Sequence, residues 1–168
     1  MNDNGYIRKI DDLGRIVIPK EVRKRLKIHE GENLIINTSD KNINLSKYSY
    51  VENNHNFINK IGDKISFLTD FNIIVTDLEH IIYSNQEFNE LQISKDLKTY
   101  ISNRTSNILT DLELNNQEKI IGHIVIEPII ANSICIGLVI LYHQNNHEYI
   151  SKIAKLIASI ISIHVDES

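Results

Sequence analysis

Basic side chains gather near the N-terminus at a density that could bind a polyanion. Residues 5–28 contain eight Lys and Arg against three Asp and Glu, an excess of five positive charges. The cations are Arg8, Lys9, Arg15, Lys20, Arg23, Lys24, Arg25 and Lys27. Clustered guanidinium and ammonium groups bind nucleic-acid phosphates, although such a run is more often a solvated surface. The residue types alone leave DNA binding and a merely solvated face as equal alternatives.

Short elements must position these cations. The stretch "DDLG" has turn chemistry, Pro19 suits a helix start, and Val22 and Leu26 lie four apart on one face of the helix that follows. Apolar, β-branched runs predict four short strands, over residues 6–10, 15–18, 33–37 and 43–48. The last two form a hairpin around "TSDKN". The unit is therefore four strands and one helix.

The cations take different roles in this arrangement. Arg15 at a Gly-flanked turn and Arg8 on the neighbouring strand form a basic prong that could enter a groove. The cations of the helix hold phosphates instead. Asp11 and Asp12 either orient the arginines by ion pairing or serve as turn formers.

The small size of this unit predicts self-association. A domain of about 50 residues buries too little surface to be comfortably stable alone, and this one has neither a disulfide nor a metal motif. We expect its core to be completed by a second copy. Two-fold pairing would also place two basic surfaces side by side.

The stretch from Gly5 to Tyr48 resembles the swapped-hairpin DNA-binding domain of the AbrB family. The resemblance rests on residues at the family spacing, namely Arg8, Asp11, Gly14, Arg15, Pro19, Arg23 and Leu26. It implies that two protomers interleave hairpins into one β-barrel and that the arginines approach DNA. The chain departs from the family at Lys24, where an arginine is common, and lysine offers a point charge without bidentate contacts. The predicted DNA-binding residues are Arg8, Lys9, Arg15, Arg23, Lys24 and Arg25.

The remainder of the chain has a different organisation. Residues 1–50 carry ten basic against seven acidic side chains, and residues 51–168 carry eight against fifteen, which predicts two domains with this boundary. Periodicity predicts a helix over 56–68, a strand pair at 72–77 and 80–84, a long hairpin over 122–143 and a last helix over 148–165. This α+β order resembles a GAF domain with an antiparallel sheet, although periodicity does not separate GAF from PAS. It names no ligand-binding residue.

The last helix has more apolar positions than one sheet needs. Ile153 and Ile160 fall in this surplus, which predicts a second self-contact, shared with Phe57, Ile61 and Ile65 of the 56–68 helix. Two self-interfaces on one chain allow a homodimer or a homotetramer.

Catalytic and metal chemistry find little support. Phosphate-loop, nucleophile-elbow and common zinc motifs are missing from the sequence. Cys135 reads as a structural thiol, and His143 and His147 as solvated loop residues. Asp77 and Glu127 could form an acid–base pair only if the fold joined them. The sequence thus predicts no enzyme, no cofactor and no metal.

Together these patterns predict an α+β transcription regulator that binds double-stranded, AT-rich DNA. The resemblance implies sporulation, in particular forespore gene control, with a C-terminal domain for oligomerisation or for sensing an unknown small molecule. With no apolar run of 18 residues, a cytoplasmic, nucleoid-associated protein without membrane contact is expected. Two alternatives remain: an antitoxin-type module that neutralises a toxin, and a metabolite-binding enzyme.

Overall fold

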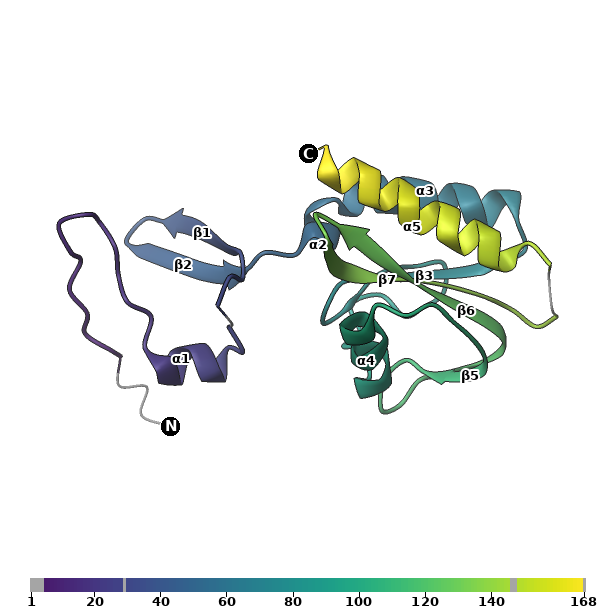
Figure 1. Ribbon diagram of the computed structural model, residues 1–168, viewed down its shortest axis with the longest axis horizontal. Helices are drawn as coiled ribbons and strands as arrows, with labels where there is room; N and C mark the ends of the chain where they lie inside the picture. The colour runs from purple at the N-terminus through teal and green to yellow at the C-terminus, as the bar shows by residue number, and fades with distance from the viewer. Residues whose placement is uncertain (1–4, 29, 146–147, 168) are drawn as a thin grey trace. The chain divides into compact units, whose positions relative to one another are not determined.

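The computed structural model describes residues 5–28, 30–145 and 148–167. The chain forms two compact units, Met1–Tyr48 and Ser49–Ser168, which are described separately (Figure 1). Each contains at least one helix and one antiparallel sheet, so the α+β class is confirmed.

The N-terminal unit is built on one helix and one hairpin. Its elements are α1 (Lys20–Arg25), β1 (Leu34–Ser39) and β2 (Asn42–Lys47). The strands pair in register from Leu34 opposite Lys47 to Ser39 opposite Asn42, so the hairpin prediction is confirmed. An ion pair between Lys47 Nζ and Glu32 Oε1, 3.1 Å long, ties the base of the hairpin to the segment before it.

The two other predicted strands, over residues 6–10 and 15–18, do not form, and the unit is not a closed barrel. Within the described residues of one chain these segments have no strand beside them to complete a hydrogen-bonded ladder. Most of their apolar side chains consequently stay in solvent, with Ile7 91% and Val17 74% exposed. None of residues 5–28 and 30–48 is buried. The unit therefore lacks a core of its own.

The C-terminal unit is organised around a five-stranded antiparallel sheet. Its strands are β3 (Asn72–Thr76), β4 (Ile81–Ser84), β5 (Asn107–Glu113), β6 (Lys119–Ala131) and β7 (Ile134–His143), in the spatial order β4-β3-β7-β6-β5. The predicted long hairpin is β6 and β7, and its turn places Asn132 and Ser133 at positive φ, 50° and 63°. Strand β5 was missed because it lies at an edge of the sheet, where only Leu112 is buried and the apolar pattern is weak.

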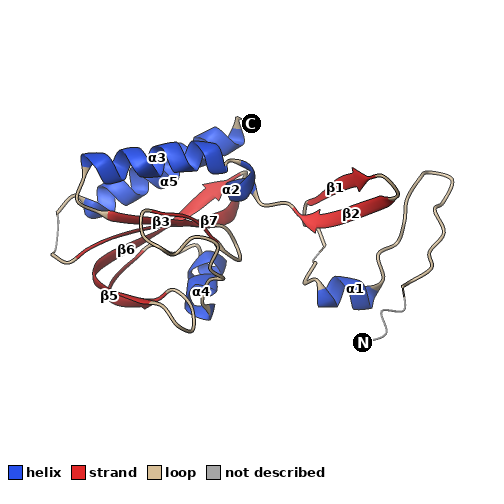
Figure 2. Cartoon of the chain, turned by 180° about the vertical axis from the view of Figure 1, so that it is seen from behind, coloured by secondary structure: helices blue, strands red, loops and turns tan. Residues whose placement is uncertain are grey.

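Helices cover both faces of this sheet. The helices α2 (Tyr50–Asn53), α3 (His55–Leu68) and α5 (Ile150–Asp166) lie on one face, and α4 (Lys95–Asn103) lies on the other (Figures 1 and 2). The predicted helices over 56–68 and 148–165 are thus confirmed as α3 and α5. Helix α5 seals its face with Ile150, Ala154, Ile157, Ala158, Ile161 and Val165. The opposite core includes Ile74, Ile81, Leu97, Ile101, Ile124, Ile126 and Leu138.

Part of the predicted surplus on α5 belongs to the core. Ile153 packs against the α3–α5 core, as do Phe57, Ile61 and Ile65 of α3. All four are only partly buried, and their share in a self-contact stays a prediction. The exposed apolar residues of α5 are Leu156 at 58%, Ile160 at 37% and Ile163 at 57%. Helical geometry separates the core-facing from the exposed apolar residues of α5. Successive residues point about 100° apart around the helix axis, so the face that packs on the sheet cannot also face solvent.

Candidate nucleic-acid interface

The centre of the basic segment is a closed turn held by one carboxylate. Asp11 Oδ1 accepts hydrogen bonds from the backbone N–H of Leu13 at 3.1 Å and of Arg15 at 2.7 Å. The backbone N–H groups of Asp11 and Gly14 donate to the carbonyls of Arg15 and Asp11, at 3.1 and 3.0 Å. Gly14 sits at φ +75°, a conformation that glycine adopts without strain. The turn is therefore fixed by its own residues.

The same carboxylate orients a candidate DNA-binding side chain. Asp11 Oδ2 accepts from Arg15 Nε at 2.7 Å. Hydrogen bonds from the Arg15 backbone amide and then its guanidinium lower the pKa of Asp11 below the ordinary value of 3.8. The pair uses Nε, and 71% of the Arg15 side chain remains exposed, so the terminal guanidinium nitrogens face solvent. Asp11 thus serves as both turn former and arginine partner.

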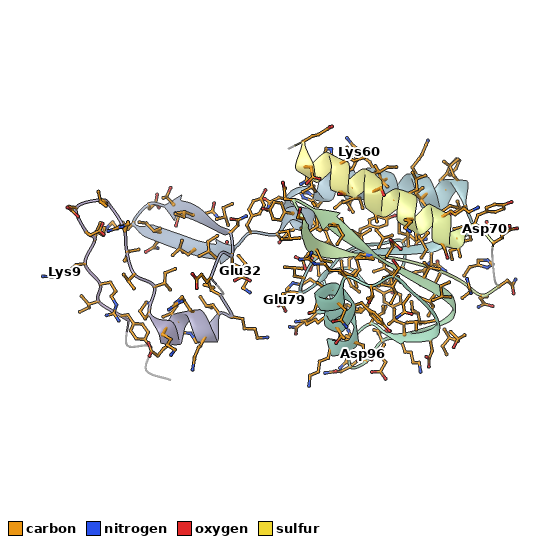
Figure 3. The ribbon with its side chains drawn as sticks, viewed as in Figure 1. Lys9, Glu32, Lys60, Asp70, Glu79 and Asp96 are labelled. Carbon is orange, nitrogen blue, oxygen red and sulfur yellow. The ribbon has the colours of Figure 1, made fainter. Side chains whose placement is uncertain are left out.

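Arg8 and Lys9 lie on the extended segment before this turn. Arg8 Nη1 donates to the Ile7 carbonyl at 2.9 Å, and its guanidinium carbon lies 5.8 Å from the centre of the Tyr6 ring. The Lys9 side chain points away from the ribbon (Figure 3). Because the flanking segments do not pair, the predicted approach of Arg8 to Arg15 across a hairpin is not formed within one chain.

The remaining predicted cations, Arg23, Lys24 and Arg25, occupy the last turn of α1, and all three are exposed. Pro19 precedes the helix with φ −56°, and the helix closes where the N–H groups of Lys27 and Ile28 reach back to carbonyls of its last turn at 3.2 and 2.8 Å. Positive side chains are favoured near these carbonyls, since the C-terminal end of a helix carries partial negative charge. The helix therefore holds these three cations at its C-terminal end, while Lys20 lies at its first position.

The other titratable residues singled out in the sequence form no joint site. Cys135 Sγ donates to the Gly137 carbonyl at 3.4 Å, and burial raises the pKa of its thiol, which disfavours the nucleophilic thiolate. His143 is half-buried, accepts from the Asn145 amide at 3.0 Å and meets Phe71 edge-on, so its reading as a solvated residue was wrong. His147 lies outside the described residues.

Asp77 and Glu127 lie in different environments and do not form an acid–base pair. Asp77 is 6% exposed and accepts from Ser49 Oγ at 2.8 Å and from the Glu79 and His80 amides, both at 2.7 Å. Sequence reasoning missed this contact, which anchors the first residue of the C-terminal unit, because the partners lie 28 positions apart. Glu127 lies on the sheet face under α5 and does not share this network.

Over residues 5–28, 30–145 and 148–167, the His, Cys, Asp and Glu side chains form no group of three suited to a metal ion. None of the helices described there has the length and apolar character needed to cross a bilayer.

Known proteins resemble both units. Stage V sporulation protein T of Bacillus subtilis (strain 168) is 29% identical over 154 residues, 86% of each chain. Transition state regulatory protein AbrB of the same organism is 48% identical over 48 residues, 29% of this chain and 50% of AbrB. A solved structure, "Crystal structure of a methyl-accepting chemotaxis protein, residues 122 to 287", aligns over 64% of this chain and 85% of that chain at 14% identity, with a TM-score of 0.48.

Two family models divide the chain between them. Residues 7–53 match the model "Antidote-toxin recognition MazE, bacterial antitoxin", which agrees with the AbrB-like character of the N-terminal unit. Residues 54–165, about two thirds of the chain, match the model "Stage V sporulation protein T C-terminal, transcription factor". The chain therefore belongs to the stage V sporulation protein T C-terminal transcription factor family and carries a MazE/AbrB-like domain in front of it.

Proposed function

We propose that the chain is a DNA-binding transcription regulator of sporulation whose residues 1–50 bind double-stranded, AT-rich DNA. The observation that carries this proposal is the exposed basic segment, in which Asp11 fixes a turn and presents Arg15 to solvent. The family match to a transcription factor and the likeness to stage V sporulation protein T and AbrB support the same role. A regulatory role requires no catalytic residues.

The proposed DNA-binding residues divide by their place in the fold. Arg15 and Arg8 lie at and before the turn, where a narrow, exposed segment can enter a groove and reach base edges. Lys9 and the helical cations Arg23, Lys24 and Arg25 bind phosphates and position the backbone.

A second copy of the chain completes the DNA-binding unit in this proposal. The segments 6–10 and 15–18 are extended, apolar and without a ladder partner in the described chain, as expected of strands that pair with another protomer. A swapped-hairpin dimer would bury Ile7 and Val17 and double the number of cations on one surface.

The C-terminal residues 51–168 are proposed to be a GAF-like domain for oligomerisation and ligand sensing. The exposed apolar side chains Leu156, Ile160 and Ile163 on α5 support a second self-contact, because exposed apolar patches mark interaction surfaces. Two self-interfaces would make the protein a homotetramer.

Salt dependence tests the electrostatic basis of DNA binding. If two protomers supply roughly 6 to 10 phosphate contacts, affinity should fall by about 10³ to 10⁵ between 50 and 200 mM salt. The measurement is a titration of AT-rich and random duplexes by fluorescence anisotropy at several salt concentrations. A nearly flat dependence would refute the assignment of the basic segment.

Matched variants test the division of roles. Arg15→Ala should reduce the preference for specific over random DNA by about tenfold or more, since one good base contact is worth about 1–3 kcal/mol. Lys24→Ala should weaken both complexes alike, because a phosphate contact carries no sequence information. Lys41→Ala, an exposed cation in the β1–β2 turn, is the control and should change neither. Parallel losses from Arg15→Ala and Lys24→Ala would contradict the proposal.

The antitoxin alternative rests on the MazE match at residues 7–53. The longer match at residues 54–165 is to a transcription factor family, and for that reason we place DNA regulation first.

A further inference from the structure

A cavity of about 390 Å³ opens between the start of α5 and the β5–β6 edge of the sheet. Its wall comes from Ser151, Lys152 and Lys155 on α5. Its floor comes from Val125 and Glu127 on β6, and its rim from residues 106–108 at the start of β5. The volume lies in the range of small-molecule sites, about 300–1,000 Å³.

The arrangement of the layers explains why this space is open. Ile108 on β5 pairs with Val125 on β6, so both side chains project from the same face of the sheet. Helix α5 packs over β6 and β7, where it buries Val125, but it does not extend over the edge strand. Ile108 is consequently 59% exposed, although it belongs to the helix-covered face. An apolar surface is left beside the polar start of the helix.

Glu127 is the unusual residue of this cavity. Its neighbours in the alternation, Val125 and Ile129, both belong to the core under α5, so Glu127 points into the same layer. The side chain is half-buried, and its carboxylate makes no hydrogen bond or ion pair within the described residues, but its oxygens keep contact with solvent. Because the carboxylate has no partner and is accessible to solvent, it is available to a cationic group supplied from outside the protein.

The charges of the cavity select the kind of ligand. A simple anion would be attracted by Lys152 and Lys155 but repelled by Glu127. A simple cation would be attracted by Glu127 but repelled by the two lysines. A zwitterion satisfies both ends. The partial positive charge at the start of α5 adds to the attraction for a carboxylate at the lysine end.

We propose that this cavity binds a free aliphatic α-amino acid. The ligand's carboxylate lies at Lys152 and Lys155, its ammonium group at Glu127, and its side chain on Ile108 and Val125. The inference rests on the sensory role proposed for the C-terminal domain and gives it a ligand class. It concerns binding alone, so it can fail while DNA regulation stands, and the two are measured separately.

The test is calorimetric titration of the full chain with L-leucine, L-isoleucine and L-valine, each compared with analogues that lack one charge. For leucine the analogues are 4-methylpentanoate, without the ammonium group, and 3-methylbutylamine, without the carboxylate. At least one amino acid should bind, and each of its analogues should bind about tenfold or more weakly, because each leaves a charged group of the site unpaired. Amide NMR shifts on binding should centre on residues 106–108, 127 and 151–155.

Two isosteric variants make the result specific. Glu127→Gln removes the charge but keeps the shape, and it should abolish the preference for the amino acid over the analogue that lacks the ammonium group. Glu87→Gln, an exposed carboxylate outside the cavity, should leave that preference unchanged. The proposal is overturned if none of the three amino acids gives heat or shifts at about 10 mM, which would saturate a site with a Kd near 1 mM. It is equally overturned if the analogues bind as well as the amino acids, or if the shifts centre elsewhere. DNA binding measured on the same samples reports on the regulator proposal independently.

Discussion

Removing the Ser49 hydroxyl should destabilise the C-terminal unit more than an ordinary helix cap would. Ser49 Oγ accepts from the Glu52 amide at 3.1 Å, capping α2, and it donates to Asp77 Oδ2 at 2.8 Å. Asp77 is 6% exposed, and its remaining described partners are two backbone amides at 2.7 Å. One side chain therefore joins the start of the unit to the β3–β4 turn.

The magnitude follows from these two bonds. Loss of an N-cap costs about 1 kcal/mol. Loss of a hydrogen bond to a charged, buried group costs about 1.5–3 kcal/mol more. Ser49→Ala should therefore lower the free energy of unfolding by about 2.5–4 kcal/mol. Ser94→Ala is the matched control: Ser94 caps α4 by accepting from the Leu97 amide at 3.2 Å, so its loss should cost only about 1 kcal/mol.

Urea unfolding followed by near-ultraviolet circular dichroism measures both variants. The signal includes Tyr83 and Tyr142, which are buried in the C-terminal unit, and so it reports on that unit. Equal losses for Ser49→Ala and Ser94→Ala would refute the reasoning. A double-mutant cycle with Asp77→Asn checks it again, since strictly additive effects would mean that the hydroxyl and the carboxylate are not coupled.

Three further predictions concern a titration, a close contact and the assembly. Because the pKa of Asp11 is lowered, its contribution to the turn is present above pH 4 and is lost as the pH falls through its folded-state pKa. The NMR signal of the Arg15 Nε–H group should follow that loss. Asp11→Asn should abolish the titration. Gly137→Ala should lower the free energy of unfolding in urea by about 1–3 kcal/mol, because the new Cβ would lie 1.9 Å from a backbone oxygen on β3. The control is Gly5→Ala, whose Cβ would have no atom within 4 Å, so this change should be neutral. Leu156→Lys combined with Ile163→Lys should convert a tetramer to a dimer, measured by light scattering, and should weaken DNA binding, measured by fluorescence anisotropy. A wild-type chain that is not tetrameric would contradict the second self-contact.

Local sequence signals determined much of the secondary structure. The β1–β2 hairpin, the β6–β7 hairpin and the two amphipathic helices were predictable because each depends on residues close in the chain, through turn chemistry or apolar periodicity. The basic cluster and the turn at Gly14 were visible for the same reason. Family spacing added the expectation of DNA binding, which composition alone left open.

Residues that contact each other across long separations were decided by the tertiary structure. Ser49 and Asp77 are 28 positions apart, and Glu127 meets the start of α5 only because β6 runs beneath that helix. Strand β5 is specified by its pairing with β6 more than by its own weakly apolar pattern. The segments 6–10 and 15–18 likewise depend on contacts distant in the chain. Their sequence favours strands, yet a strand requires a partner for its backbone hydrogen bonds, and one copy of the N-terminal unit provides none.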